Sequence, residues 1–190
     1  MQEMERVTKE TKIRCSIDKD GTGQGIINTG IGFFDHMLEA LSKHSGIDID
    51  LVCEGDLHVD DHHSVEDCGI VLGQLLRKEI FPIENVERYG NATVVMDEAA
   101  VTCALDLSNR PYLVYESDIF GKVGEFDVEL VEEFFHALTG NCGITCHIIT
   151  ERGRNKHHII EAAFKAFAVA LRRALAENCK LGIPSTKGVL

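Results

Sequence analysis

The chain has 190 residues, which is enough for one domain or two small fused repeats with a buried core. Hydrophobic residues make up 44% of it and charged residues 26%, as in ordinary globular proteins. Its net charge of −12 argues against nucleic acid or an anionic membrane as a partner, because both attract basic surfaces. No apolar run approaches the roughly 18 residues of a membrane span, and the polar N-terminus is unlike a signal peptide.

Alternating apolar residues predict strands, and apolar residues three and four apart predict helices. In the first half these elements are a strand at 5–17, a turn at 18–23, a short strand at 26–27, a helix at 33–42, a strand at 47–53 and a helix from 62 to about 81. In the second half they are strands at 94–96, 101–107 and 113–115, a helix at 130–138, a strand at 144–149 and a helix from 157 to about 178.

The two halves repeat each other. A shift of 97 residues places Gly46 on Gly143, and a shift of 88 places Glu10 on Glu98. Each half reads strand, strand, helix, strand, helix, so the repeat predicts an α+β fold built from two half-repeats, residues 1–88 and 89–190. The changing shift requires only loops of slightly different length.

A pair of adjacent histidines followed by a glutamate occurs once in each half, as HHSVE at 62–66 and HHIIE at 157–161. On a helix the glutamate lies beside both histidines, whereas the histidines themselves diverge by about 100°. The two histidines of one pair are therefore better placed to bind two different partners than one, and two such pairs indicate a paired metal site.

The repeat adds one candidate ligand per half, because His36 in the first half corresponds to Glu133 in the second. A histidine–carboxylate set without thiolates suits Mn, Fe, Co, Ni or Zn. A single histidine is more often structural or exposed, and Glu133 alone would be read as a solvated carboxylate. The eight candidate metal ligands are His36, His62, His63, Glu66, Glu133, His157, His158 and Glu161.

The seven cysteines are scattered, lack a CxxC spacing and lie mostly in apolar runs. We expect buried thiols in a reducing compartment, and hence a cytoplasmic protein.

Motifs along nearly the whole chain resemble the imidazoleglycerol-phosphate dehydratase family of histidine biosynthesis. The matching stretches are GIGFFDHMLEAL (30–41), GDLHVDDHHSVED (55–67), ERYG (87–90), LDLSNRPYL (105–113), GITCHI (143–148), NKHHIIEAAFKAFAVALRRAL (155–175) and PSTKGVL (184–190). The resemblance implies duplicated half-domains with sheets packed on helices, similar to the second domain of ribosomal protein S5. It also implies a lyase that dehydrates D-erythro-imidazole glycerol phosphate to imidazole acetol phosphate, with two Mn²⁺ per active site between subunits of a homo-oligomeric 24-subunit shell.

Carried onto this sequence, the family's ligands form two sets. One metal takes His36, His63, His157 and Glu161, and the other takes His62, Glu66, His158 and Glu133. Many relatives have a histidine where this chain has Glu133, and His136, one turn further on, is the alternative ligand. The expected substrate-binding residues are Glu10, His36, His62, Arg88, Arg110, Ser185 and Lys187, of which the last four form a phosphate clamp.

Chemistry supports such a dehydration, because the imidazole ring is the electron sink available for losing the C3 hydroxyl. Two metals on the ring nitrogens would favour an imidazolate that expels this hydroxyl. A general acid/base must move the C2 proton, and Glu10 is our first candidate, with Glu161 second. Two other classes stay open: a dinuclear metallohydrolase of a phosphorylated small molecule, and a non-catalytic metal-binding or assembly module.

Overall fold

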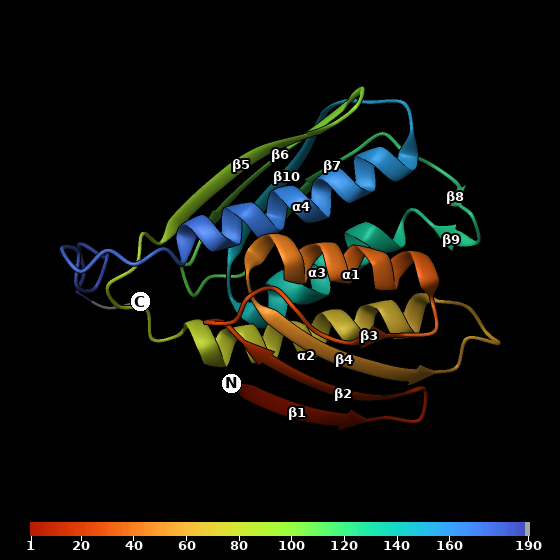
Figure 1. The fold of residues 1–190 in the computed structure, drawn as a ribbon, viewed down its shortest axis with the longest axis horizontal. Coiled ribbons are helices and arrows are strands. Elements are labelled where there is room, and N and C mark those ends of the chain that lie inside the picture. The colour runs from red at the N-terminus through yellow and green to blue at the C-terminus, as the bar shows by residue number, and fades with distance from the viewer. Residues whose placement is uncertain (189–190) are drawn as a thin grey trace.

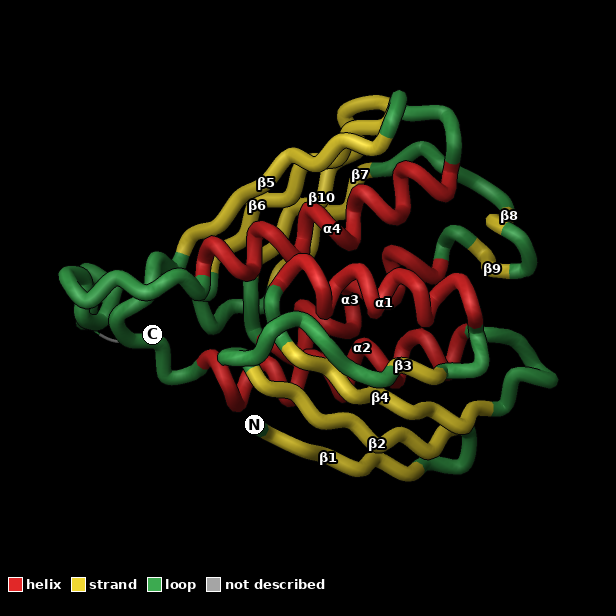
Figure 2. Tube along the Cα trace, in the orientation of Figure 1, coloured by secondary structure: helices red, strands yellow, loops and turns green. Residues whose placement is uncertain are grey.

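Two four-stranded sheets form the outer layers of the molecule, and four helices fill the space between them (Figure 1). This computed structural model describes residues 1–188. The first half contains β1 (Gln2–Val7), β2 (Thr11–Asp18), β3 (Ile27–Asn28), α1 (Gly32–Ser45), β4 (Asp48–Gly55) and α2 (His62–Ile80). The second half contains β5 (Tyr89–Met96), β6 (Ala99–Asp106), β7 (Tyr112–Glu116), β8 (Lys122–Val123), β9 (Phe126–Asp127), α3 (Leu130–Cys142), β10 (Thr145–Arg152) and α4 (Lys156–Ala174). Figure 2 shows the same layers by type of element.

The two sheets have matching topologies. Their strand orders are β1-β2-β4-β3 and β5-β6-β10-β7, and in each the last strand runs parallel to its neighbour while the others are antiparallel. The helices α1 and α3 also end alike, at Gly46 and Gly143 with φ of 80° and 81°. Each glycine donates its N–H to the residue four positions earlier, which closes the helix in a left-handed cap that glycine adopts without steric cost. The structure confirms the predicted α+β fold with internal duplication.

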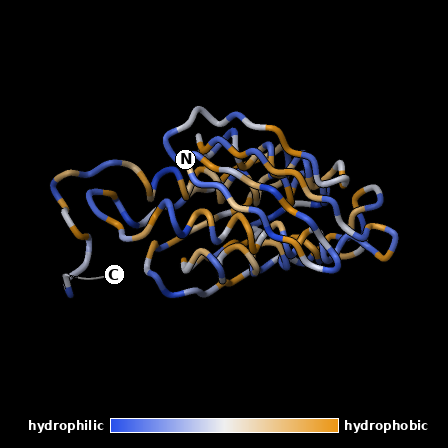
Figure 3. The backbone as a smooth tube through the Cα atoms, turned by 90° about the horizontal axis from the view of Figure 1, so that it is seen from below, coloured by the Kyte–Doolittle hydropathy of each residue, from blue (hydrophilic) through white to orange (hydrophobic). Residues whose placement is uncertain are grey.

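A single hydrophobic core joins the halves, because the helices of one half pack against those of the other. Its widest side chains form an aromatic cluster in which the rings of Phe134 and Phe164 lie 5.2 Å apart and those of Phe135 and Phe167 lie 5.3 Å apart. Along β2 buried and more exposed residues alternate, so one face meets the helices and the other faces outward. Figure 3 shows hydrophobic and hydrophilic stretches following one another along the backbone.

Two glycines allow α2 and α3 to approach closely. A Cβ atom on Gly69 would lie 2.8 Å from the carbonyl oxygen of Phe134, and one on Gly73 would lie 2.5 Å from that of Leu138. Side chains at these positions would force the helices apart. The glycines therefore set the spacing between the middle of α2 and α3, and this spacing matters for the site described below.

Two predicted elements were wrong, and one short hairpin was not predicted. Residues 5–17 form two strands rather than one, because the hydroxyl of Thr8 accepts the N–H groups of Glu10 and Thr11 and closes a hairpin turn between them. The last helix ends at Ala174, four residues early. The short β8–β9 hairpin has no alternating pattern long enough to predict it.

Six of the seven cysteines are buried free thiols, as expected, and Cys179 is exposed. Across residues 1–188 we find no helix with the length and apolar character needed to cross a bilayer.

Candidate metal centre

Both histidine pairs lie in the first turn of a long helix, held there by similar contacts. Asp60 accepts the backbone N–H of His62 at the start of α2 (2.9 Å), and the side chain of Asn155 accepts that of His157 at the start of α4 (3.0 Å). Asp and Asn suit this role because their short side chains satisfy N–H groups that have no partner within the helix. The residues just before each helix thus place each histidine pair in the first helical turn.

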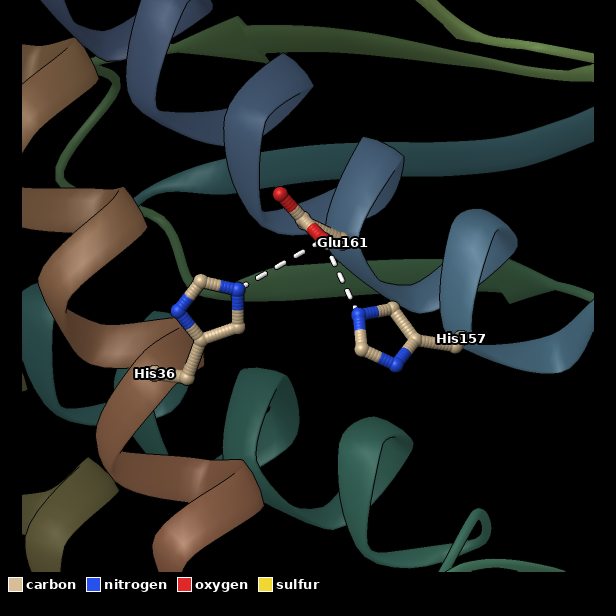
Figure 4. A group of neighbouring side chains, drawn as sticks. All are labelled: His36, His157 and Glu161. Carbon is tan, nitrogen blue, oxygen red and sulfur yellow. Dashed lines mark hydrogen bonds and ion pairs between the residues drawn. The ribbon is translucent and has the colours of Figure 1, made fainter.

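Three predicted ligands from both halves meet at the start of α4, and we call them the α4 cluster: His36, His157 and Glu161. The Nε2 atoms of His36 and His157 lie 3.6 and 3.1 Å from the same oxygen of Glu161. Figure 4 shows both rings, one from α1 and one from α4, directed at this carboxylate. Their ligand atoms lie within 4.8 Å of one another, a spacing that one metal ion can span.

Glu161 is the buried member of the α4 cluster, with a side chain only 8% exposed. Its second oxygen accepts a hydrogen bond from Lys165 Nζ at 2.6 Å. Burial alone would raise the pKa of Glu161, but the hydrogen bond and charge of Lys165 outweigh it and hold this pKa below its usual value. The carboxylate is therefore ionised and ready to accept a cation.

A second group, the α2 cluster, consists of His62 and Glu66 from α2 and Glu133 from α3. Its ligand atoms also lie within 4.8 Å of one another, and His62 Nε2 is 4.0 Å from the nearer oxygen of Glu66. The glycines that let α2 approach α3 bring Glu133 to this position. His136 lines the same cavity of about 380 Å³ but lies outside the cluster.

The remaining two predicted ligands, His63 and His158, lie outside both clusters in the single chain. His63 Nδ1 contacts the carboxylate of Asp56 at 3.0 Å, and its Nε2 is 3.8 Å from Glu10. This contact with Asp56 raises the pKa of His63.

His158 has a corresponding environment, with Nδ1 hydrogen-bonded to Glu98 at 2.9 Å and Nε2 at 3.9 Å from Asp97. Glu98 also accepts the backbone N–H groups of Arg154 and Asn155, at 3.0 and 2.7 Å. The backbone donors and His158 lower the pKa of Glu98 to about 2, so it is ionised at neutral pH.

Residues of the expected phosphate clamp gather at the other end of the molecule. Arg88 is buried, donates through Nε and Nη2 to Asp106, and donates through Nη1 to the carbonyl of Pro184 at 2.7 Å. Its backbone N–H bonds to the carbonyl of Ala174, the last residue of α4. Three of the five donor positions of the guanidinium are thus occupied by the protein, and Arg88 anchors the C-terminal segment.

The other clamp residues lie beside Arg88. Arg110 is 71% exposed and approaches Asp106 at 3.8 Å, so its guanidinium is free to bind an anion. Ser185 follows the anchored Pro184, and its hydroxyl accepts the N–H of Lys187. The structure brings the four predicted clamp residues to one region. Of the two arginines in the clamp, Arg110 is the more accessible.

The sequence did not single out the groups that contact the candidate ligands and the clamp. Lys165 carries no motif of its own, although it lies four residues after Glu161 on a helix. Glu98 was in register with Glu10 in the repeat, a signal that could have singled it out. Asp56 and Asp106 lie within stretches matched to the family but have no distinguishing spacing.

The comparisons with known proteins agree with this architecture. The model of the imidazoleglycerol-phosphate dehydratase family matches residues 29–171, most of the chain. The chain belongs to this family. Membership identifies a dehydratase, an enzyme of histidine biosynthesis, and decides among the three classes of function that the sequence left open.

Relatives of the dehydratase match over the full length. The imidazoleglycerol-phosphate dehydratases of Aliarcobacter butzleri and of a Sulfurovum species are 77% and 64% identical over 190 residues, with both chains fully covered. The crystal structure of the Staphylococcus aureus dehydratase has a TM-score of 0.84 at 43% identity, covering 93% of this chain and 98% of that one. IGPD from Pyrococcus furiosus, solved in complex with (S)-C348, has a TM-score of 0.85 at 40% identity, covering 98% and 100%.

Proposed function

We propose that this dehydratase converts imidazole glycerol phosphate to imidazole acetol phosphate at a site that holds two Mn²⁺ ions. The observation that carries the proposal is the pair of histidine–carboxylate clusters at the starts of α2 and α4, each assembled from both halves of the chain. The net reaction removes the C2 hydrogen and the C3 hydroxyl as water. The enol that results tautomerises to the ketone, and the phosphate group stays attached.

The donor sets of both clusters fit divalent manganese. The α4 cluster offers two imidazole nitrogens and one carboxylate, and the α2 cluster offers one imidazole and two carboxylates. Nitrogen and oxygen donors without thiolate suit Mn²⁺. Metals bound there would supply Lewis-acid polarisation of the imidazole ring of the substrate. We propose His63 and His158 as the fourth ligands, supplied by neighbouring subunits.

Glu10 is the group that we propose to move the C2 proton. It lies in the hairpin turn between β1 and β2, where the hydroxyl of Thr8 accepts its N–H. Its side chain is 53% exposed and lies 3.8 Å from His63 Nε2, next to a proposed ligand. An exposed carboxylate on a fixed turn can approach a substrate atom without being used as a ligand itself.

We propose an active site shared between subunits, and the distance between the α4 cluster and the clamp supports it. The α4 cluster lies at the first turn of α4, whereas Arg88 bonds to its last residue (Figure 1). The 19-residue helix spans about 28 Å at 1.5 Å per residue, which exceeds the length of a phosphorylated imidazole glycerol. The phosphate is therefore bound by Arg110 and Lys187 of another copy, and Arg in particular pairs with phosphate in a bidentate manner.

The reaction is tested by following product and phosphate together. Dehydration predicts a ketone product that absorbs as its enol, with phosphate retained. Release of free phosphate would instead support hydrolysis and overturn the proposal. As control, Glu10→Gln should abolish turnover while leaving the metal content near two per subunit.

Shared active sites are tested by mixing two inactive variants. Glu161→Gln removes a ligand at one end and Arg110→Gln removes a phosphate donor at the other, and each should be inactive alone. Dissociated and reassembled in equal amounts, they should recover activity, up to about a quarter of wild type if one subunit supplies each end. No recovery in mixed assemblies of wild-type size would mean that each chain builds its own site.

For the size of the assembly we propose the 24-subunit shell of the family, located in the cytoplasm, where the buried free thiols would stay reduced. Exhaustive chelation should abolish activity. Analytical ultracentrifugation before and after chelation shows whether metal also holds the particle together, and a particle of unchanged mass would argue that it does not.

A further inference from the structure

The second histidine of each pair is held by a carboxylate that comes from outside its own helix. His63 Nδ1 contacts Asp56, which lies just after β4, and His158 Nδ1 contacts Glu98, which lies in the β5–β6 turn. The first histidines, His62 and His157, instead face the glutamate four residues later on the same helix. The two members of each pair are thus distinguished by their hydrogen-bond partners.

These contacts determine which ring nitrogen carries the proton. An ionised carboxylate only accepts hydrogen bonds, so Nδ1 of the neutral imidazole must donate and Nε2 keeps its lone pair. The surroundings of His158 agree, because the amide nitrogen of Asn155 lies 3.5 Å from Nε2 and Asn155 itself is oriented by accepting the N–H of His157. Metal-binding histidines commonly donate their second nitrogen to a carboxylate in this way.

We propose that Glu98 and Asp56 are positioning residues that hold His158 and His63 in the tautomer whose Nε2 is free to bind a metal. This inference rests on the proposed function, because it takes both histidines to be ligands. The register of the repeat would pair Glu98 with Glu10, but their contacts differ: Glu98 contacts Nδ1 of its histidine, whereas Glu10 faces Nε2.

The surroundings of Glu98 make a sharp substitution available. One oxygen of Glu98 accepts two backbone N–H groups, from Arg154 and Asn155, and the other meets His158. In Glu98→Gln the two backbone donors must keep the amide oxygen, so the amide NH₂ is directed at Nδ1. A donor there requires an unprotonated Nδ1, which moves the proton to Nε2 and blocks the metal-binding nitrogen.

Asp56 provides the matched opposite case. Both of its oxygens lie near His63 Nδ1, at 3.2 and 3.0 Å, and within residues 1–188 its carboxylate accepts no backbone N–H. An amide at this position is free to turn its oxygen toward Nδ1. We therefore expect Asp56→Asn to retain the tautomer of His63, although the same chemical change at Glu98 inverts that of His158.

The test measures tautomer and metal affinity separately. Solid-state ¹⁵N spectra of metal-free protein labelled at histidine, taken at about pH 9, well above the ordinary pKa of imidazole, distinguish protonated from unprotonated ring nitrogens. His158→Gln assigns the His158 signals. We expect Glu98→Gln to shift the proton to Nε2 and to weaken binding of one Mn²⁺ about 10- to 100-fold, the effect typical of groups that orient a ligand. Asp97→Asn is the control, because Asp97 lies in the same exposed turn and asparagine tolerates the positive φ of this position. It should change neither the tautomer of His158 nor the Mn²⁺ affinity.

An unchanged His158 tautomer in Glu98→Gln overturns the inference, as does an inverted tautomer with unchanged Mn²⁺ affinity. A structural role in the loop alone would lower the melting temperature without inverting the tautomer, and that outcome also contradicts it. Failure of the proposed function looks different, because wild-type protein would then bind no Mn²⁺ at all while its tautomers stayed measurable.

Discussion

The two clusters use the same repeated motif but differ in how their charge is balanced. In the α4 cluster a single nearly buried carboxylate, Glu161, is neutralised by Lys165 at 2.6 Å. In the α2 cluster two carboxylates lie close together, and within residues 1–188 neither Glu66 nor Glu133 pairs with a lysine or arginine. The histidine–glutamate motif is therefore repeated in both halves, but the compensating cation of Glu161 has no counterpart at Glu66 or Glu133 within residues 1–188. The carboxylate of the α4 cluster is therefore compensated within the chain, whereas the carboxylates of the α2 cluster would gain the same compensation only from a bound cation.

The largest effect should follow from removing the buried carboxylate of the α4 cluster. Glu161→Gln removes the one charged ligand there, so we expect kcat/KM to fall about 1,000-fold, or about 4 kcal/mol, with metal content dropping from two to one per subunit. Glu39→Gln removes a 60% exposed carboxylate near His36 and serves as control. Elemental analysis together with steady-state kinetics checks both, and full metal content in Glu161→Gln would remove this residue from the ligand set.

The α2 cluster should be more tolerant, because its carboxylate Glu66 is 41% exposed whereas Glu161 of the α4 cluster is only 8% exposed. We expect Glu133→Ala to lose one metal and about 100-fold in activity, and Glu133→His to retain both, since an imidazole also binds Mn²⁺. The exposed neighbour substitution Glu132→Ala is the control. Loss of the metal in His136→Ala instead would transfer the role to that residue.

The built-in cation of the α4 cluster is tested by Lys165→Met. Without its partner, the buried carboxylate of Glu161 is left uncompensated in metal-free protein, which should cost about 3 kcal/mol of unfolding free energy. Metal would replace the missing charge, so the rise in melting temperature on adding Mn²⁺ should be larger in this variant than in wild type. The double variant with Glu161→Gln should recover most of the lost stability; if it does not, Lys165 acts through packing.

The smallest expected effect is a pH dependence at Glu98. Its pKa in the folded protein, about 2, is below the value of 4.5 for a free glutamate, so its ionised form stabilises the fold above about pH 4.5 and this contribution is lost as pH falls toward 2. The gap in urea stability between metal-free wild type and Glu98→Gln should be constant near neutral pH and shrink below about pH 4.5. A gap independent of pH down to 2.5 would show that the charge of Glu98 contributes nothing.

The sequence predicted most of the fold because the repeat made each half a check on the other. The repeat placed Gly46 and Gly143 at equivalent positions, and these glycines close α1 and α3. The hairpin turn at Glu10 was missed because the β-branched residues on both sides of it continue the strand pattern. The turn depends on the hydroxyl of Thr8, a local contact that propensity does not reveal.

Six of the eight candidate ligands that the sequence named lie together in the two clusters, but the groups around them were not predicted. The histidine pairs and the correspondence between the two repeats can be read from the amino-acid sequence, so the residues of both clusters could be named in advance. Lys165 and Asp106 act through side-chain geometry that becomes visible only when helices and strands are placed in space. The sequence also did not reveal that the α4 cluster and Arg88 would lie at opposite ends of α4.

That separation has a kinetic consequence. If a working site needs both the start of α4 from one chain and the region around Arg88 from another, folding alone does not produce activity. Dilute enzyme should lose specific activity while its circular dichroism spectrum stays native, and recovery on concentrating it should follow a rate law of order higher than one in protein. A folded but solitary chain would then be an inactive precursor whose final step of maturation is encounter with its own kind.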